Sequence, residues 1–416
     1  MIGTGVFTSL GFQLVDIQSI FPLLMLWVIG GIVACLGALV YSELGSALPR
    51  SGGEYHLLYR IIHPSIGFGA GIVSATVGFT APAVLAAMAL GSYLKAVFPM
   101  IDQTIVASIV ILFFHAIHMK SIRWGTSFQI GSTAIKVGLI FIFIIFGFFT
   151  AADNHQSISI IPKPGDGSIL LSSSFAVSLV WVSYAYTGWN SVIYIAGEIK
   201  EPQRNISKTM FFSTSFVMCM YILLNYIFLY TVPVADMVGQ VDVGYISGVV
   251  IFGNTGAMVI GIGISILLLS TVSSYVYIGP RIMQIMGEDH KLLSFLKIKD
   301  NKNIPRNAFW LQLLLSFLFI ATSSFEQVLM YAGISLIITT TMTVISLFIL
   351  RYQEPLLDRP YRVKGYPFTP LIYLIVNVWI LYYSFQENQF ESFIGIGIVT
   401  SSVLIHYIFT KRNILL

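Results

Sequence analysis

The heptapeptide Tyr184-Ala185-Tyr186-Thr187-Gly188-Trp189-Asn190 interrupts an otherwise apolar segment, Ile169–Gly197. About 20 apolar residues suffice to cross the hydrocarbon core of a bilayer, and this segment is longer. Polar groups and a glycine at its centre indicate two half-helices that meet at a joint. In lipid, such a joint is tolerated only where protein buries it or where it lines a watery cavity. The sequence therefore predicts a broken membrane helix at this stretch.

The first residues of the chain form another stretch of this kind. Met1-Ile2-Gly3-Thr4-Gly5-Val6-Phe7 places two glycines on either side of a hydroxyl residue. Glycine lets the backbone leave helical geometry, and the free N–H groups of a new helix N-terminus can bind an anion. Small residues are also common where membrane helices pack closely, so each stretch alone is ambiguous. Two breaks that each open a block of five spans favour inverted repeats with a substrate site at the membrane midplane.

The composition agrees with a membrane protein. Of 416 residues, 56% are hydrophobic and 10% are charged, whereas soluble proteins carry about 25% charged residues. Collagen-like, disordered, zinc-finger and disulfide-scaffold classes are excluded. We predict eleven complete spans: Phe21–Leu48, Ile66–Val97, Thr104–His118, Phe128–Ala151, Ile169–Gly197, Met210–Val232, Ala257–Met283, Ala308–Ser323, Val328–Leu350, Pro370–Phe385 and Ser392–Phe409.

The basic residues predict the orientation of these spans. If the loop after the Phe21 span is cytoplasmic, nineteen of the 22 lysines and arginines lie inside, Lys95 and Lys163 lie outside, and Lys136 lies within a span. Cytoplasmic loops carry an excess of Lys and Arg. We therefore expect an integral, multi-pass protein of the cell (inner) membrane with a cytoplasmic C-terminus.

Sites for enzyme chemistry or metal binding are not evident in the sequence. His115 and His118 have no third ligand nearby, and Gly67-x-Gly69-x-Gly71 opens a membrane helix instead of following a strand as a nucleotide loop would. No Ser/His/Asp set can be placed in one water-filled site. No carboxylate lies deep in a span, so we expect no proton relay of buried Asp or Glu. We expect no enzyme, no cofactor, no metal and no nucleic-acid partner.

Five stretches together carry a resemblance to a known family. They are Ile2–Phe7, Pro49–Tyr55, Tyr184–Asn190, Gly197–Asn205 and Arg359–Val363. In this order they resemble the amino acid permeases of the amino acid–polyamine–organocation (APC) superfamily, and the 184–190 stretch looks closest to the L-type amino acid transporter branch and its bacterial relatives. The resemblance covers essentially the whole chain.

The resemblance implies an all-α polytopic protein with the LeuT-type 5+5 inverted repeat and two additional C-terminal helices. Residues 1–152 would hold spans 1–5, residues 169–351 spans 6–10, and residues 368–410 spans 11–12. Family members begin span 1 well before the Gly-Thr-Gly motif, whereas this sequence begins at the joint itself. We therefore expect the first half-helix of span 1 to be encoded upstream of Met1.

A zwitterionic amino acid needs donors for its carboxylate and acceptors for its ammonium. Backbone N–H groups near Thr4 and Gly5 could supply the donors, and carbonyls near Met1, Ile2, Tyr184 and Ala185 the acceptors; the resemblance implies the same. It also places Tyr184 as an aromatic gate, although a core tyrosine is the plain alternative. Trp189 and Asn190 line the pocket or pack the joint. The predicted substrate-binding residues are Ile2, Gly3, Thr4, Gly5, Tyr184, Ala185, Gly188, Trp189 and Asn190.

Lys136 is a basic residue well inside a predicted span. A charge there costs about 2.5–3.5 kcal/mol on insertion scales. The plain alternative is a side chain that carries its ammonium to the interface. The resemblance implies instead that the ammonium takes the place of the sodium ion that sodium-coupled relatives hold. Lys136 could also exchange a proton, because burial disfavours the charged form.

The sequence thus predicts amino acid transport by alternating access, as sodium-independent exchange or facilitated uptake. A neutral substrate is weakly favoured, because no mid-membrane carboxylate is available for a cationic one. The alternatives are a proton-coupled symporter that uses Lys136 and, in another class, a non-transporting amino acid sensor on the same scaffold. The expected partners are an amino acid and the lipid bilayer. A homo-oligomer or an accessory subunit is left open.

Overall fold

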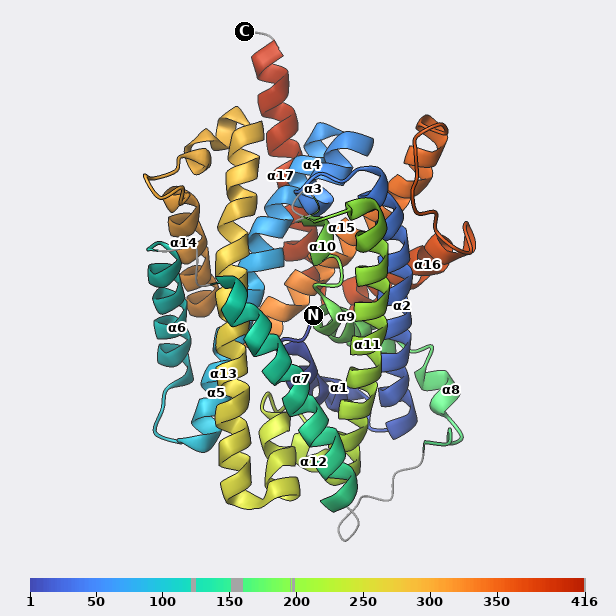
Figure 1. The fold of residues 1–416 in the computed structure, drawn as a ribbon. Helices are drawn as coiled ribbons and strands as arrows, with labels where there is room; N and C mark the ends of the chain where they lie inside the picture. Colours follow the sequence, from blue (N-terminus) through green and yellow to red (C-terminus); the bar gives the residue numbers. More distant parts are fainter. Residues whose placement is uncertain (121–124, 151–159, 195, 197–198, 415–416) are drawn as a thin grey trace.

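The computed structural model describes residues 1–120, 125–150, 160–194, 196 and 199–414 (Figure 1). Its long helices form a bundle, and every regular element within these residues is helical. Eight helical paths in the described residues are long and apolar enough to cross a membrane. They are formed by α2 (Ile20–Ala47), α4–η1–α5 (Pro64–Val97), α7 (Gly125–Thr150), α11 (Pro202–Thr231), α13 (Val243–Asp289), α15 (Phe325–Gln353), α16 (Phe368–Glu387) and α17 (Gln389–Ile414).

Three further helical segments complete the predicted set. The helices α6 (Gln103–His118) and α14 (Arg306–Thr322) are apolar but shorter, and the segment Ile169–Gly197 contains α9 (Ser173–Tyr186) and α10 (Ser191–Tyr194). Each of the eleven predicted segments therefore contains helix. The boundaries differ most in α11, which begins at Pro202, and in α13, which extends well beyond both predicted ends. At Gly253, with a φ of 69° and a ψ of 176°, α13 leaves helical geometry and turns back, so that Gly248 before the turn packs against Ala257 after it (Figure 1).

Burial in the bundle is that of a membrane protein. Large apolar side chains point outward: Ile105 on α6 is 60% exposed, and Leu314 on α14 and Ile375 on α16 are each 67% exposed. Polar side chains instead lie inside, as do Thr8 and Gln13 of α1 (Gly5–Asp16). An apolar exterior and long apolar helices fit a lipid surround. The chain is an integral multi-pass membrane protein.

The helix α4 continues into α5 through one wider turn. Residues Ser74–Thr80 form the π-helix η1, between α4 (Pro64–Val73) and α5 (Ala81–Val97). The hydroxyls of Thr76 and Thr80 donate to backbone carbonyls of the preceding turn, at 2.7 Å each. π-Turns are rare and are frequent at functional sites. This one faces the helix break at residues 184–190, which we call the second break; the break at residues 1–7 is the first break.

Short helices mark the two ends of the bundle. The helices α3 (Gly53–Ile61) and η3 (Lys291–Lys297) lie at the same end as the loop between α15 and α16, which carries Arg359. We call this the basic end; it is the upper end in Figure 1. The short helix α12 (Val234–Met237) lies at the opposite end. The N-terminus lies within the bundle, beside α9 and α11 (Figure 1).

Candidate functional site

The second break lies where the sequence predicts it. The helix α9 ends at Tyr186, Thr187 turns the chain out of helical geometry with a ψ of 151°, and α10 starts at Ser191. Gly188 has a φ of +94°, a backbone conformation that residues other than glycine rarely adopt. The backbone N–H and the hydroxyl of Thr187 both donate to the carbonyl of Tyr184, at 2.9 and 2.7 Å. The predicted helix break is therefore confirmed.

The first break touches the second one. Residues 1–4 are not helical, and α1 begins at Gly5. A Cβ atom placed on Gly5 would lie 2.4 Å from the Cα atom of Ala185, so the two backbones are in direct contact. The side chains of Thr4 and Tyr184 lie near each other at the same contact. The structure thus brings Thr4, Gly5, Tyr184 and Ala185 together.

Carbonyls of the first break are already hydrogen-bonded. The Tyr221 hydroxyl of α11 donates to the carbonyl of Met1 at 2.9 Å, and Lys136 Nζ donates to that of Ile2 at 3.3 Å. The predicted ammonium acceptors Met1, Ile2 and Tyr184 are therefore occupied in this closed arrangement. The first intrahelical bond of α1 runs from Phe7 N to Thr4 O, at 3.0 Å. The N–H groups of the first turn precede that bond, and such groups have no partner within their own helix.

Lys136 reaches inward instead of to the surface. Its side chain on α7 is only 4% exposed, and its ammonium donates to Thr271 Oγ1 of α13 at 2.7 Å as well as to Ile2 O. One cation therefore joins the first break, α7 and α13. The Lys136 ammonium therefore does not extend to the membrane–water interface in this structure.

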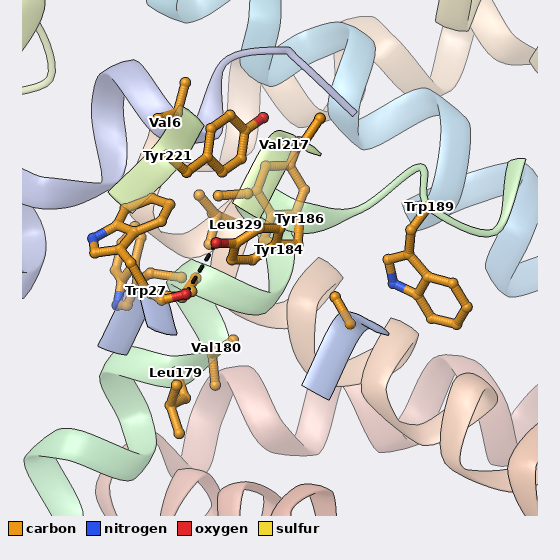
Figure 2. Close-up of a cluster of buried hydrophobic side chains, with 14 of the residues drawn as sticks. Val6, Trp27, Leu179, Val180, Tyr184, Tyr186, Trp189, Val217, Tyr221 and Leu329 are labelled. Atoms are coloured by element: carbon orange, nitrogen blue, oxygen red, sulfur yellow. Dashed lines mark hydrogen bonds between the residues drawn. The ribbon is translucent and has the colours of Figure 1, made fainter. Parts of the chain in front are cut away.

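Figure 2 shows how the aromatic residues divide around the second break. Tyr184, Tyr186 and Tyr221 lie on one side with Trp27 of α2, where the Tyr186 hydroxyl donates to the Trp27 carbonyl at 2.9 Å. Trp189 lies apart from them (Figure 2). Its ring packs edge-on against Tyr41 of α2, with centroids 4.7 Å apart.

Two small cavities flank Thr187 and Trp189. One, of about 40 Å³, lies between α2, α9, α15 and α16 and reaches Tyr184. The other, of about 50 Å³, lies against η1 and α13, where Phe79 and Tyr275 line it. A water needs about 10–15 Å³ on this measure, so each cavity holds about three or four waters. Both are too small for an amino acid, and the bundle is closed around the second break.

Comparison with known proteins identifies the family. Residues 1–411 match the family described as amino acid permease. The chain belongs to the amino acid permease family. The permease is a transporter and not an enzyme, and the resemblance drawn from its five sequence stretches is confirmed.

Its relatives include three kinds of mammalian transporter. The mouse b(0,+)-type amino acid transporter 1 is 25% identical, over 98% of the permease and 85% of the relative. The human large neutral amino acids transporter small subunit 2 is 24% identical, over 98% of the permease and 77% of the relative. The mouse Asc-type amino acid transporter 1 is 24% identical, over 98% and 78%.

Glu54 is a buried carboxylate that contacts the second break. It lies on α3 and is 1% exposed; its Oε1 accepts from Asn190 Nδ2 at 2.7 Å and from the Tyr41 hydroxyl at 3.0 Å. Burial raises the pKa of Glu54 above its ordinary value, against the lowering effect of hydrogen bonds from Tyr41, Thr339 and Asn190. Asn190 therefore binds protein, and through Glu54 the second break is tied to the basic end of the permease.

A second buried carboxylate, Glu43, explains the Arg359–Val363 stretch. Glu43 is fully buried near the end of α2 and accepts two hydrogen bonds from Arg351, at 2.8 and 2.6 Å, and one from Val363 N at 2.7 Å. Arg359 Nε lies 3.4 Å from the same carboxylate. This cluster fixes the loop after α15 to α2. Of the Gly197–Asn205 stretch, Gly197 and Glu198 lie outside the described residues.

These two carboxylates correct one expectation. In the sequence, Glu43 and Glu54 lie at the ends of spans and not deep within them. We therefore expected no buried Asp or Glu that could form a proton relay. Both are buried, because α3 folds back over the bundle and the α15–α16 loop covers the end of α2. Glu54 lies within the recognised Pro49–Tyr55 stretch, so the signal for a functional group was present. The pairing with Asn190 requires the fold.

Proposed function

We propose that the permease moves neutral amino acids by alternating access, through sodium-independent exchange or facilitated uptake. The observation that carries this proposal is the contact between the two breaks, Gly5 against Ala185, with Lys136 bonded to the first of them. Helix breaks that meet inside a membrane bundle are typical of transporter substrate sites. The name of the human relative specifies large neutral amino acids, which supports a neutral substrate here.

In this proposal the substrate carboxylate binds the N–H groups at the start of α1 together with the Thr4 hydroxyl. A helix N-terminus favours an anion because its N–H groups are free and the helix dipole is positive there. Tyr184 closes over the substrate, because it already contacts Thr4. The ammonium takes carbonyls near Ala185 and Gly188 once the two breaks separate and admit it, because the Ile2 carbonyl already accepts from Lys136.

Lys136 accounts for the proposed independence from sodium. Its ammonium contacts a carbonyl of the first break and a hydroxyl of α13, which are oxygen ligands of the kind that hard cations bind. A fixed cation at this point makes a bound sodium ion unnecessary and repels one. The same burial favours a second candidate, proton-coupled symport, in which Lys136 releases its proton during each cycle.

We further propose that residues 1–152 and 169–351 are inverted repeats and that the basic end is cytoplasmic. In each proposed repeat the break lies at the start, before α2 and before α11. Orientation follows from the excess of Lys and Arg at the basic end. It can be tested with an impermeant thiol reagent after Cys35 and Cys219 are replaced by serine. A cysteine at Lys302 should react only from the cytoplasm and one at Lys163 only from outside.

Proteoliposomes loaded with unlabelled amino acid separate the two transport modes. Exchange predicts that internal substrate accelerates uptake of labelled neutral amino acid, with no change when choline replaces sodium. Proton symport predicts uptake into empty vesicles driven by an inward proton gradient. The proposal of exchange fails if internal substrate has no effect and the proton gradient alone drives accumulation.

A further inference from the structure

A polar cavity lies at the basic end, away from the two breaks. It has a volume of about 440 Å³ and lies between the last turns of α13 and the loop that leads into α14. Tyr277, Arg281 and Gln284 of α13 line one wall, and Lys299, Asn303 and Phe309 line the other. The cavity shares no residue with the two small cavities beside Trp189. Transport as proposed above gives it no role.

Arg281 is the notable group in this cavity. Three other arginines at this end have carboxylate partners: Arg50 pairs with Asp289, Arg60 with Glu354 and Arg306 with Asp300. Among the described residues, no carboxylate forms an ion pair with Arg281.

The Arg281 guanidinium instead stacks 3.9 Å above the Tyr277 ring and donates to the Tyr277 hydroxyl. A guanidinium has five N–H donors, so this contact leaves most of them for a ligand.

The rest of the lining also favours an anion. Lys299 adds a second cation, although it lies 3.7 Å from Glu288 at the rim, and Glu288 also accepts from Gln284 at 2.8 Å. The amides of Gln284 and Asn303 add polar atoms to the lining. Arginine matches the geometry of phosphate oxygens with paired N–H donors. The lining therefore fits a phosphate group better than a cation.

The surroundings of the cavity fit a phosphate that a lipid carries. Trp310 and Leu314 on α14 are 57% and 67% exposed, and Ile298 in the preceding loop is 59% exposed. In a membrane this apolar face meets acyl chains, and tryptophan favours the headgroup level. Basic pockets between transmembrane helices on the cytoplasmic side bind acidic headgroups. Polar cavity and apolar face are adjacent on α14.

We propose that this cavity binds the phosphate of an anionic phospholipid, with Arg281 as its principal ligand. The acyl chains lie along α14, and Lys299 contacts the headgroup at the rim. A soluble phosphate has the same anionic group but gains nothing from the apolar face.

Native mass spectrometry of the delipidated permease tests this inference. Dioleoyl phosphatidylglycerol should bind the wild type better than dioleoyl phosphatidylcholine, and Arg281→Gln should weaken phosphatidylglycerol binding about tenfold, because hydrogen bonds to charged groups are strong. Arg281→Lys keeps the charge but loses the paired donors and should fall in between. The matched control, Arg60→Gln, removes a charge from the same end at an ion-paired site and should leave binding unchanged.

Three outcomes would overturn the inference. Equal binding of phosphatidylglycerol by Arg281→Gln and the wild type would remove the site. An equal loss in Arg60→Gln would reduce it to general charge attraction. The third outcome is that inorganic phosphate stabilises the wild type but not Arg281→Gln, and that phosphatidylglycerol does not compete with it. The ligand would then be a soluble anion. Size-exclusion profiles establish that each variant is folded; if Arg281→Gln is not, Lys299→Gln and Arg281→Lys carry the test.

Discussion

Gly5 at the start of α1 lies against Ala185 at the end of α9 so closely that a Cβ atom on Gly5 would be 2.4 Å from the Ala185 Cα atom. By contrast, a Cβ atom on Gly3 would meet Thr271 Cγ2 at 3.6 Å, an ordinary contact. The two glycines of one motif therefore have different reasons to be glycine. Gly5 lets two backbones touch, and Gly3 leaves space that a methyl group can fill.

This contrast predicts that Gly5→Ala destabilises the permease while Gly3→Ala does not. Overpacking costs about 1–3 kcal/mol, and here the clash is with backbone, which cannot move aside as a side chain would. We expect a lower melting temperature in detergent and loss of substrate binding for Gly5→Ala, and a melting temperature near that of the wild type for Gly3→Ala. Similar stability for the two variants would mean that α1 and α9 are not in contact.

Lys136→Met should abolish most transport without unfolding the permease. The change leaves Ile2 O and Thr271 Oγ1 without their charged donor, so we expect the uptake rate to fall about tenfold or more. Thr271→Ser keeps the hydroxyl and is the matched control, which should transport normally. Sodium replacement by choline should leave wild-type uptake unchanged. Strong stimulation of the wild type by sodium would refute the role given to Lys136.

Glu54→Gln and Glu54→Ala should differ in stability. Two donors to Glu54, the Tyr41 hydroxyl and Asn190 Nδ2, reach the same oxygen, Oε1. Glutamine retains an acceptor there, whereas alanine leaves two buried donors unpaired at about 1–3 kcal/mol each. The measurement is the melting temperature of each variant in detergent. If Glu54→Gln is as unstable as Glu54→Ala, the negative charge itself is needed and the hydrogen bonds are not the reason.

The spans and the breaks could be predicted from the sequence because they depend on local properties. Long apolar segments predicted the helices, and Thr187-Gly188 predicted the break, where Gly188 adopts a positive φ. The burial of Glu43 and Glu54 could not be predicted, because it depends on which segments of the tertiary structure fold over them. The occupied carbonyl of Met1 likewise depends on Tyr221, more than two hundred residues away in the chain. No periodicity in the sequence reports such a pairing.

The Glu43 cluster predicts a large loss of stability from a single change. Glu43→Ala removes the carboxylate that pairs with Arg351 and Arg359, and Arg359 is only 9% exposed. Breaking a buried ion pair by removing one partner costs about 3–5 kcal/mol. Arg60→Ala removes the exposed pair with Glu354 and should cost less than about 1 kcal/mol. A small effect of Glu43→Ala on the melting temperature would show that the loop after α15 is not held by this cluster.

The stability of the permease should fall as the pH drops from about 6.5 to about 4, and His290 beyond the end of α13 is one cause. Burial lowers the pKa of His290 to about 4, with a smaller contribution from His406. Burial likewise lowers the pKa of His56 on α3 to about 4, with a contribution from Arg50. Both titrate near 6.5 in an unfolded chain. Between these values the unfolded chain binds more protons than the folded one, so the free energy of unfolding rises with pH across this window.

His290→Gln tests this contribution to the pH dependence. In the wild type, His290 Nε2 contacts the Tyr55 hydroxyl and Nδ1 contacts His406, at 3.1 Å each, and Tyr55 also donates to Asp289. Glutamine has a donor and an acceptor but binds no proton in this range, so the melting temperature should depend less steeply on pH between 6.5 and 4. His290→Gln combined with His56→Gln should flatten the curve further. An unchanged slope in both variants would place the proton uptake on other groups.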